Sequence, residues 1–533
     1  MADTSSTDSG PHAPNVDKVL VEMETAPAGK FPYGIDTEGK AKYCPVWRFT
    51  QPHMVAFHLS WVAFFISFIA TFAPASLLPV IRDDLNLTKS ELGNAGVAAV
   101  CGAIAARIGM GVFVDVVGPR YGTAATMLVT APAVFCMSLV TDYSTFAVTR
   151  FFIGCSLCMF VCCQFWCGTM FNVRIVGTAN AIAAGWGNMG GGACHFIMPL
   201  IYQGIMNGGT PGYQAWRWSF FVPGGLYILT SLATLLYGID HPSGKDYRDL
   251  KKEGTLKTKG AMWPVLKCGL GNYRSWIFFL TYGYCFGVEL TVDNIIVEYM
   301  FDQFGLSLSV AGALGAIFGL MNLFTRASGG MISDYVAKYW GMRGRIWALW
   351  IIQTLGGVFC IVLGLVSNSL SSTIVVMIIF SIFCQQACGL HFGVVPFVSR
   401  RAYGVVSGLV GAGGNTGAAV TQAIWFAGTA QWQLNLPKNE GLVWMGVQTI
   451  ALTLPLVFIW FPMWGSMFTG PKEGAQEEDY YMKEWSAEEV AQGLHQGAMR
   501  FAIESKSQRG LKERKAMGLE EDVPAVKVAS VSA

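Results

Sequence analysis

The stretch RIGMGVFVD at residues 107–115 recurs 219 positions later as RASGGMISD at residues 326–334, and this repeat decides how the chain is organised. In each copy an arginine is followed by a glycine four residues on and by an aspartate eight residues on. The same register aligns Leu87, Ser90 and Gly96 with Leu306, Ser309 and Gly315. The repeat therefore predicts two similar halves, each with one copy of the motif.

A second duplication, at a register of 227, lies in two glycine-rich segments, AGWGNMGGG at 184–192 and GAGGNTG at 411–417. The aligned residues are Arg174, Gly177, Gly187, Asn188 and Gly190 in the first half, and Arg401, Gly404, Gly414, Asn415 and Gly417 in the second. Small residues let two helices approach closely and leave room for a ligand. Generic tight packing is the alternative reading. A duplicated asparagine among duplicated glycines favours a functional site, because each amide can hydrogen-bond a ligand or the facing helix.

The composition is typical of a polytopic membrane protein. Only 13% of the 533 residues are charged, 53% are hydrophobic, and the mean hydropathy is +0.43. Soluble globular proteins carry roughly 25% charged residues, so this composition argues against a large soluble enzyme and excludes a disordered chain. The net charge of +2 gives no reason to expect a nucleic-acid partner. The expected surroundings are a lipid bilayer.

Twelve membrane-spanning helices are predicted, which makes the fold class all-α. A span needs ~20 predominantly apolar residues, and uncharged runs such as 175–216 and 346–399 are long enough for two helices each. With turn residues as boundaries, the spans fall near 54–80, 92–114, 121–141, 146–171, 176–202, 217–237, 275–299, 308–332, 346–366, 372–396, 403–427 and 443–467.

The basic residues of the loops predict that both termini are cytosolic. Fifteen Lys and Arg fall on one side, namely Arg120, Arg174, eight from Lys245 to Arg274, Lys338, Arg343, Arg345, Arg400 and Arg401. Four fall on the other, namely Arg82, Lys89, Arg217 and Lys438. A multi-pass protein of the plasma membrane is the default expectation.

These spans divide the chain into five parts. A flexible cytosolic tail (1–50) precedes the first six-helix half (51–240), and a charged cytosolic linker (241–274) leads to the second half (275–468). A charged cytosolic tail (469–533) follows. Residues 480–506 of this tail could form a surface helix, but a solvated, partly disordered regulatory tail is the favoured interpretation.

Arg107 and Arg326 are charged residues inside predicted spans, and they occupy equivalent positions. An arginine at this depth costs ~2.5–3.5 kcal/mol, so it should face a cavity or a partner. The acids of the first half all lie near helix ends, and Arg107 has no obvious carboxylate partner there. Pseudo-twofold symmetry would bring the two guanidinium groups face to face, and a small planar anion such as nitrate, nitrite or bicarbonate would suit their planar donors. Snorkelling or bonding to backbone carbonyls is the alternative.

Two parallel six-helix repeats joined by a charged loop describe the major facilitator architecture. The residues that follow the second and eighth spans resemble the cytoplasmic gate motif of that superfamily, in which a carboxylate and a basic loop clamp neighbouring helices. They are Gly111, Asp115 and Arg120 in the first half and Gly330, Asp334 and Arg343, with Arg345, in the second. An ordinary helix end followed by a turn is the alternative, but the recurrence favours the gate.

Within that superfamily the chain resembles the nitrate/nitrite porter family over about residues 50–468. The twin glycine-rich segments match the signatures of the family, and FVCCQFWCGTMFN (160–172) and YGYCFGVEL (282–290) resemble its branch in algae, fungi and plants. The resemblance implies that Arg107 and Arg326 bind nitrate, that Phe160 and Phe286 are aromatic walls, and that Tyr282 donates a hydrogen bond. It also implies a small single-span accessory membrane protein as a candidate partner. Without the resemblance, these aromatic residues would be taken as packing.

Energetics favour a secondary carrier. An inside-negative potential opposes anion entry by ~2.3 kcal/mol per charge per 100 mV, and one cotransported proton only cancels the anion's charge. The chain contains no Gly-x₄-Gly-Lys-Ser/Thr fingerprint for a nucleotide. Glu289 and Asp293, four residues apart on one helical face, are the proton-coupling candidates, with Asp293 nearer the outer mouth. An equally weighted alternative is that Glu289 neutralises one of the arginines.

No cofactor, metal site or enzymatic activity is expected. Cys155 and Cys158 form a Cys-x₂-Cys pair, but no second pair or histidine lies at zinc-like spacing, so the cysteines are interpreted as small buried hydrophobic residues. The leading interpretation is a proton-coupled importer of nitrate, with nitrite as a further candidate substrate. The alternatives are an exchanger of nitrate for nitrite, a carrier of another small anion such as bicarbonate, and a nitrate sensor with secondary transport.

Overall fold

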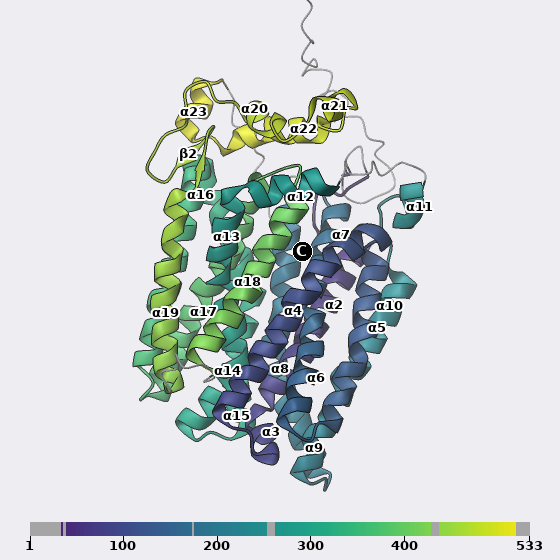
Figure 1. Ribbon diagram of the computed structural model, residues 1–533, viewed down its shortest axis with the longest axis vertical. Helices are drawn as coiled ribbons and strands as arrows, with labels where there is room; N and C mark the ends of the chain where they lie inside the picture. The colour runs from purple at the N-terminus through teal and green to yellow at the C-terminus, as the bar shows by residue number, and fades with distance from the viewer. Residues whose placement is uncertain (1–33, 36–38, 173–174, 253–261, 428–435, 519–533) are drawn as a thin grey trace, which may run out of the picture.

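The structure is a computed structural model that describes residues 34–35, 39–172, 175–252, 262–427 and 436–518. The helices run side by side as one bundle, and the C-terminal helices lie across one end of it (Figure 1). We call the end that carries α20–α23 the tail end. The opposite end, which carries α3 and α9, is the far end (Figure 1). Most of the N-terminal tail predicted at 1–50, Arg174 and the last residues, 519–533, lie outside the described part.

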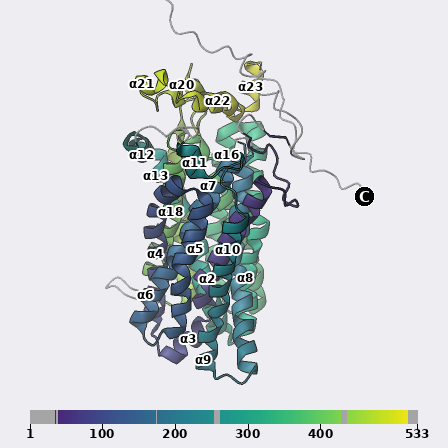
Figure 2. The same cartoon turned by 90° about the vertical axis from the view of Figure 1, so that its right-hand side faces the viewer.

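The helices of the first half are α2 (His53–Ser76), α3 (Leu78–Leu85), α4 (Lys89–Val117), α5 (Pro119–Cys136), α6 (Tyr143–Gly154), α7 (Met159–Met170), α8 (Val176–Asn207), α9 (Gly212–Ser219) and α10 (Phe221–Tyr237). Figure 2 shows this half in front. The linker contributes α11 (Tyr247–Lys252) and α12 (Met262–Gly271).

The helices of the second half are α13 (Tyr273–Gly283), α14 (Phe286–Phe304), α15 (Leu308–Leu320), α16 (Thr325–Leu365), α17 (Leu370–Phe392), α18 (Tyr403–Trp425) and α19 (Lys438–Thr453). Each of the twelve predicted spans overlaps one or more of these helices. Eight helical stretches of the described residues are long and apolar enough to cross a membrane by length and composition.

The boundaries of three predicted spans are clearly different in the structure. The spans predicted at 308–332 and 346–366 meet in the single element α16, which is kinked at Gly341, where φ is +62°. This left-handed backbone conformation favours glycine, because it has no Cβ. The last span, predicted to reach residue 467, ends at Phe458 in the short 3₁₀ helix η5 (Leu454–Phe458). A two-stranded hairpin of β1 (Trp460–Phe461) and β2 (Gly465–Ser466) follows it.

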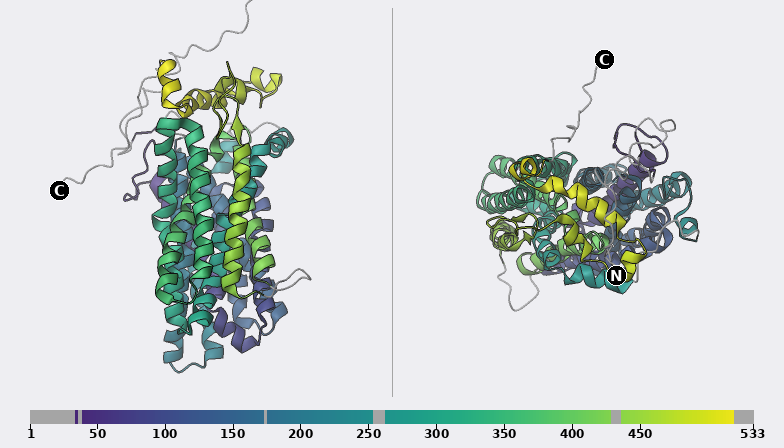
Figure 3. Two further views of the ribbon diagram at one scale, coloured as in Figure 1. Left: turned by 90° about the vertical axis from the view of Figure 1, so that its left-hand side faces the viewer. Right: turned by 90° about the horizontal axis from the view of Figure 1, so that it is seen from above.

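The described part of the C-terminal tail, which ends at residue 518, is largely helical and packed, whereas the favoured expectation for the tail was a solvated and partly disordered segment. It forms α20 (Glu477–Met482), α21 (Ala487–Ala491), α22 (Gln496–Ser505) and α23 (Leu511–Ala516). These helices lie across the tail end of the bundle (Figure 3). They are held there by buried contacts: the hydroxyl of Tyr481 donates to the carbonyl of Phe397, and the guanidinium of Arg401 pairs with Glu489.

Among the interruptions of regular helix, three lie close to predicted site residues. The 3₁₀ helix η2 (Cys155–Cys158) separates α6 from α7, residues 284–285 separate α13 from α14, and η3 (Met321–Leu323) separates α15 from α16. The interruptions lie next to Phe160, Phe286 and Arg326. Because 3₁₀ stretches inside helices often mark hinges or functional sites, these three interruptions point to the central region of the bundle.

The two halves approach closely through glycine. Helix α8 packs against α15 and α4 packs against α18. A Cβ on Gly192 would lie 2.4 Å from the backbone nitrogen of Leu320, and a Cβ on Gly93 would lie 2.2 Å from the Cα of Ala427. There is no room for a side chain at these two positions, so glycine allows the backbones of the two halves to touch.

Close glycine contact also operates within the first half, and it gives a testable prediction. A Cβ on Gly154 would lie 1.8 Å from the carbonyl oxygen of Ala99, so Gly154→Ala must push α6 away from α4. Overpacking of this kind costs about 1–3 kcal/mol. The variant is expected to have a lower melting temperature in detergent than the parent protein. Gly168→Ala is the matched control, since a Cβ there meets no described atom within 4 Å; equal melting of both variants would contradict the prediction.

Candidate functional site

Arg107 is buried in the middle of the bundle without a carboxylate partner among the described residues. It lies ten residues before the end of α4 and is 5% exposed. Its Nη1 donates to the carbonyl of Gly411 in the other half at 2.7 Å, and its Nε donates to the carbonyl of Leu157 at 3.2 Å. Its Nη2 has no hydrogen-bond partner in the described part of the chain. A buried cation thus retains one unused donor.

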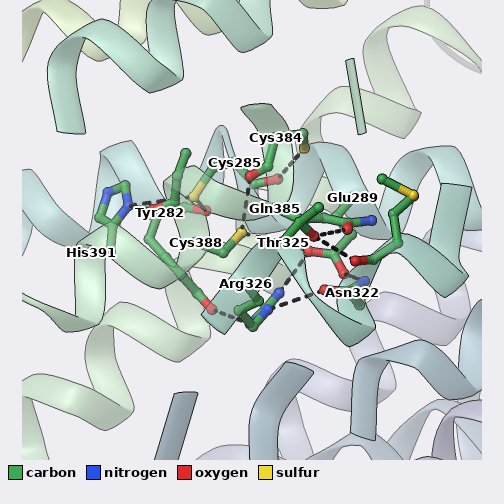
Figure 4. Close-up of polar contacts among 12 residues, drawn as sticks. Tyr282, Cys285, Glu289, Asn322, Thr325, Arg326, Cys384, Gln385, Cys388 and His391 are labelled. Atoms are coloured by element: carbon green, nitrogen blue, oxygen red, sulfur yellow. Dashed lines mark hydrogen bonds and ion pairs between the residues drawn. The ribbon is translucent and has the colours of Figure 1, made fainter. Parts of the chain in front are cut away.

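Arg326, the equivalent residue of the second half, is paired with an acid. Its Nη2 lies 2.7 Å from Oε2 of Glu289, and Nε donates to Oδ1 of Asn322 at 3.3 Å. The amide of Asn322 donates in turn to the other oxygen of Glu289 at 2.7 Å (Figure 4). Glu289 therefore neutralises Arg326 in this structure, which is one of its two expected roles.

The predicted aromatic residues line the space between the two arginines. The guanidinium carbons of Arg107 and Arg326 lie 5.7 Å and 5.3 Å from the ring centroid of Phe286, so they are no more than 11.0 Å apart. Arg107 also lies 5.0 Å from the ring of Phe160. Such distances allow cation–π attraction. Phe286 therefore lies beside both arginines, and Phe160 lies beside Arg107.

Tyr282 completes this group. Its hydroxyl accepts a hydrogen bond from Nη1 of Arg326 at 3.5 Å, and its ring stacks on Phe286 with a centroid separation of 5.4 Å. Since a hydroxyl that accepts from Arg326 keeps its own proton, Tyr282 remains able to donate to a ligand.

The twin glycine-rich segments lie against the opposite half's arginine. The carbonyl of Gly411 in α18 binds Arg107, and a Cβ on Gly185 in α8 would lie 3.3 Å from the Cβ of Arg326.

Gly414 adjoins Phe286 and Tyr282 directly. The remaining signature glycines serve close packing: Gly187 and Gly190 lie against phenylalanines of α2, and Gly417 lies against the backbone of α13.

The two signature asparagines are buried and unsatisfied. Asn188 and Asn415 are 0% exposed, and neither the oxygen nor the nitrogen of either amide has a hydrogen-bond partner among the described residues. A buried polar group without a partner costs about 1–3 kcal/mol. Two such groups at duplicated positions are expected where a polar ligand or water supplies the missing bonds.

The charges of this centre do not cancel. Arg107 and Arg326 contribute two positive charges, and Glu289 contributes one negative charge. The centre formed by these residues and the three aromatic rings therefore has an excess of one positive charge. It suits a small monovalent anion.

Sequence reasoning missed a third buried arginine. Arg150 in α6 is 3% exposed, and its Nη2 donates to Oδ1 of Asn294 in the other half at 2.8 Å. Its Nη1 donates to the carbonyl of Thr71 at 3.3 Å. Its position inside the predicted span 146–171 was the signal that could have revealed it. Arg150 thus adds a polar contact between the halves on the far-end side of the centre.

At the tail end, the predicted gate motif of the first half is tied to the linker. The backbone nitrogen of Arg120 donates to Oδ1 of Asp240 at 2.8 Å, and its Nη1 lies 3.2 Å from Asp246. Burial raises the pKa of the Asp240 carboxyl, and the hydrogen bonds that it accepts from the backbone nitrogens of Arg120 and Tyr247 oppose that effect. A Cβ on Gly111 meets no described atom within 4 Å. The side chain of Asp115 lies outside the described part of the structure.

In the second half, the partner of the gate aspartate is Arg345 and not Arg343. Arg345 Nη1 lies 2.7 Å from Oδ1 of Asp334. Arg343 instead donates to the carbonyls of Ser466 and Thr469, at 3.0 Å and 2.9 Å, because the hairpin after α19 folds back against it. Gly330 faces the other half, where a Cβ would lie 3.9 Å from that of Ala181.

At the far end, ion pairs join the halves. Arg82 Nη1 on α3 lies 2.9 Å from Asp302 and 3.3 Å from Glu298, both on α14. Within the second half, Lys438 also contacts Glu298, at 2.6 Å. Sequence reasoning used Arg82 and Lys438 only to count loop charges, and nothing in their spacing indicated these partners.

A family model described as Major Facilitator Superfamily matches residues 60–422. Nitrate transporter 2.1 of Chlamydomonas reinhardtii is 82% identical over 501 residues, which cover 94% of this chain and 91% of that protein. High affinity nitrate transporter 2.5 of Arabidopsis thaliana is 51% identical, with 91% and 95% covered. The nitrate/nitrite transporter NrtP of Nostoc punctiforme is 24% identical, with 69% and 86% covered.

Solved structures share the fold. A bacterial homolog of the human lysosomal transporter Spinster, in an inward-facing and unoccupied conformation, gives a TM-score of 0.57 at 14% identity, covering 77% of this chain and 96% of that chain. The D-xylose-proton symporter gives 0.55 at 14% identity, covering 79% and 99%. At such identity the likeness extends to the fold alone.

The Arg326–Glu289 pair predicts a strong dependence of stability on both partners. Glu289→Gln leaves a buried guanidinium without its counter-ion, which costs about 3–5 kcal/mol, so the free energy of unfolding in detergent should fall by that amount. In the double variant, Arg326→Gln added to Glu289→Gln removes the uncompensated charge, so part of the lost free energy of unfolding should return. Glu440→Gln, at an exposed position of α19, is the control. Strictly additive effects of the two substitutions would rule out the pairing.

Proposed function

Because the chain belongs to the major facilitator superfamily and, within it, to the eukaryotic branch of the nitrate/nitrite porter family, we propose that it imports nitrate by proton symport. Nitrite is the candidate second substrate. The observation that carries this proposal is the excess positive charge between Arg107 and Arg326, which a monovalent anion would cancel. The transporters of Chlamydomonas and Arabidopsis that the chain resembles carry nitrate in their names.

A planar oxyanion suits the donors of the site. Arginine presents a planar fork of N–H groups that matches an oxyanion geometrically. Nη2 of Arg107 is unused, Tyr282 retains a hydroxyl proton, and the amides of Asn188 and Asn415 are unsatisfied. In the proposed complex these groups donate to the anion while Phe286 and Phe160 exclude water on either side. Aromatic walls raise the strength of each polar bond, because they lower the local dielectric constant.

The proposed transport cycle is alternating access between the two halves. The glycine contacts of α8 and α4 with the opposite half allow rocking without rearrangement of side chains. Opening at the far end would break the pairs of Arg82 with Glu298 and Asp302. At the tail end, Asp334 and Arg345 form the proposed gate clamp of the second half. The tail end is proposed to be cytosolic, in a plasma-membrane protein with both termini inside.

The energy for uptake is proposed to come from protons. Import against an inside-negative potential costs ~2.3 kcal/mol per charge per 100 mV, so at least two protons per nitrate are needed for voltage-driven accumulation. Glu289 and Asp293 on α14 are the candidate carriers. Glu289 is engaged with Arg326, and an arriving anion would compete with it for that guanidinium.

Replacement of either central arginine tests the anion site. Arg107→Lys and Arg326→Lys keep the charge but lose the planar fork, so each should weaken apparent nitrate affinity at least tenfold, equivalent to about 1.4 kcal/mol. Uptake of labelled nitrate into proteoliposomes measures this. Arg500→Lys, on the exposed tail, is the matched control. Unchanged affinity in both central variants would refute the site.

The ion gradients separate symport from exchange. Purified protein in liposomes without internal anion should accumulate labelled nitrate when the outside is made acidic. Uptake only after preloading with nitrite or bicarbonate would instead identify an exchanger.

Two further experiments test the remaining alternatives. Uptake that appears only after a single-span membrane protein is added would establish the accessory partner. Full uptake after deletion of 469–533 would argue against a sensor that signals through its tail.

A further inference from the structure

A second buried charge centre, formed by Asp293 and His195, lies on the far-end side of the anion site. Oδ1 of Asp293 on α14 lies 3.8 Å from Nε2 of His195 on α8, and both side chains are fully buried. Asp293 is one helical turn beyond Glu289. Neither carboxylate oxygen, nor Nε2 of His195, has a hydrogen-bond partner in the described residues. Since α8 and α14 belong to different halves, the pair spans the interface that alternating access would open.

Hydrogen bonds around His195 determine where its protons lie. The hydroxyl of Ser76 donates its single proton to the carbonyl of Phe72 at 3.0 Å, and the same oxygen lies 2.8 Å from Nδ1 of His195. In the arrangement in which Ser76 donates to Phe72, that oxygen accepts from a protonated Nδ1. Nε2 then faces the carboxylate of Asp293 either as a bare lone pair or, in the imidazolium, as a second N–H.

The other titratable or charged groups near the pair are few. They are Cys194 on α8, Glu289 on α14, Arg326 on α16, Cys388 on α17, Tyr282 on α13 and Arg150 on α6, which reaches Asn294 beside Asp293. Arg326 and Glu289 are occupied with each other. Helix α15 contains no ionisable side chain, α18 has only Tyr403 at its tail-end start, and the acids and Arg82 of α3 lie at the far end.

A buried carboxylate with no hydrogen bond is too costly to remain ionised beside a neutral imidazole. Two arrangements avoid this cost: a protonated carboxyl facing the lone pair of Nε2, or a carboxylate facing an imidazolium. In both arrangements the pair carries one proton more than a carboxylate facing a neutral imidazole. Close packing at this level therefore favours a retained proton, and separation of the halves at the far end would expose both groups to solvent and let protons exchange with it.

We propose that Asp293 and His195 together form the proton-binding site of this transporter, loaded from the far-end solution when the halves part at this level, closed off when they meet, and discharged towards the tail end when the halves part there. This inference rests on the proposed nitrate symport. It assigns different tasks to the two acids of α14: Glu289 balances the charge of the anion site, and Asp293 carries the proton. The proton passes from bulk water to the pair and back to bulk water, with no other reactant.

Two transport modes distinguish the roles, both in full-length protein in liposomes. Accumulation of labelled nitrate under an imposed pH gradient requires proton loading and release. Exchange of nitrate for nitrate at equal pH requires only anion binding and movement of the halves. Asp293→Asn should lower gradient-driven accumulation at least tenfold while exchange stays within about twofold of the parent protein, because the amide keeps the shape of the carboxyl but takes up no proton.

Controls make the result specific to the pair. Asp293→Glu should restore a large part of the accumulation, since it returns a carboxyl to the same helix face. Asp142→Asn, at a far-end helix cap where asparagine is equally suitable, should behave as the parent protein. If Asp293→Asn is not recovered as folded protein, His195→Gln decides the question: it should move the pH of half-maximal accumulation by at least about one unit.

Three results would overturn the inference. Parent-like accumulation and pH dependence in Asp293→Asn would exclude Asp293 as the carrier, while the nitrate site would stand. An unchanged pH profile in His195→Gln would exclude the pair. Absence of proton-driven accumulation in the parent protein, with or without exchange, would overturn the proposed symport and the inference together.

Discussion

The burial of positive charge in an apolar bundle is the constraint on which the rest of this structure depends. Arg107 and Arg326 sit at duplicated positions between the halves, and only Arg326 has a carboxylate beside it among the described residues. A guanidinium in this environment must be surrounded by acceptors, rings or an anion. The backbone carbonyls of Gly411 and Leu157, the ring of Phe286 and the side chain of Asn322 all serve this need.

Polar contacts between the halves are arranged along the bundle axis. At the far end Arg82 pairs with acids of α14, and closer to the centre Arg150 binds Asn294 and His195 faces Asp293. All three contacts link a residue of the first half to α14. Any motion that separates the halves at the far end must break them, and α14 supplies the second-half partner in each case.

The folded tail shows how charge can mislead when only its position in the chain is known. A dense mixture of acids and bases is usually solvated, yet Glu484 accepts from the backbone nitrogens of Arg400 and Arg401, and Arg509 pairs with Glu477 at 2.7 Å. Burial raises the pKa of the Glu484 carboxyl. The Arg509–Glu477 pair and the contact of Tyr481 with Phe501 stabilise the tail itself, whereas Glu484 attaches it to the second half.

The sequence by itself determined the membrane spans, the duplication and the pair of intramembrane arginines, because these follow from apolar run lengths and from residue identity at matched positions. Only the tertiary structure decided the partners: Glu289 with Arg326, Arg345 rather than Arg343 with Asp334, and Asp293 with His195. Partner choice depends on how each helix is rotated and translated against its neighbours. A shift of one residue turns a side chain by about 100°, and such a shift leaves hydropathy and spacing in the sequence unchanged.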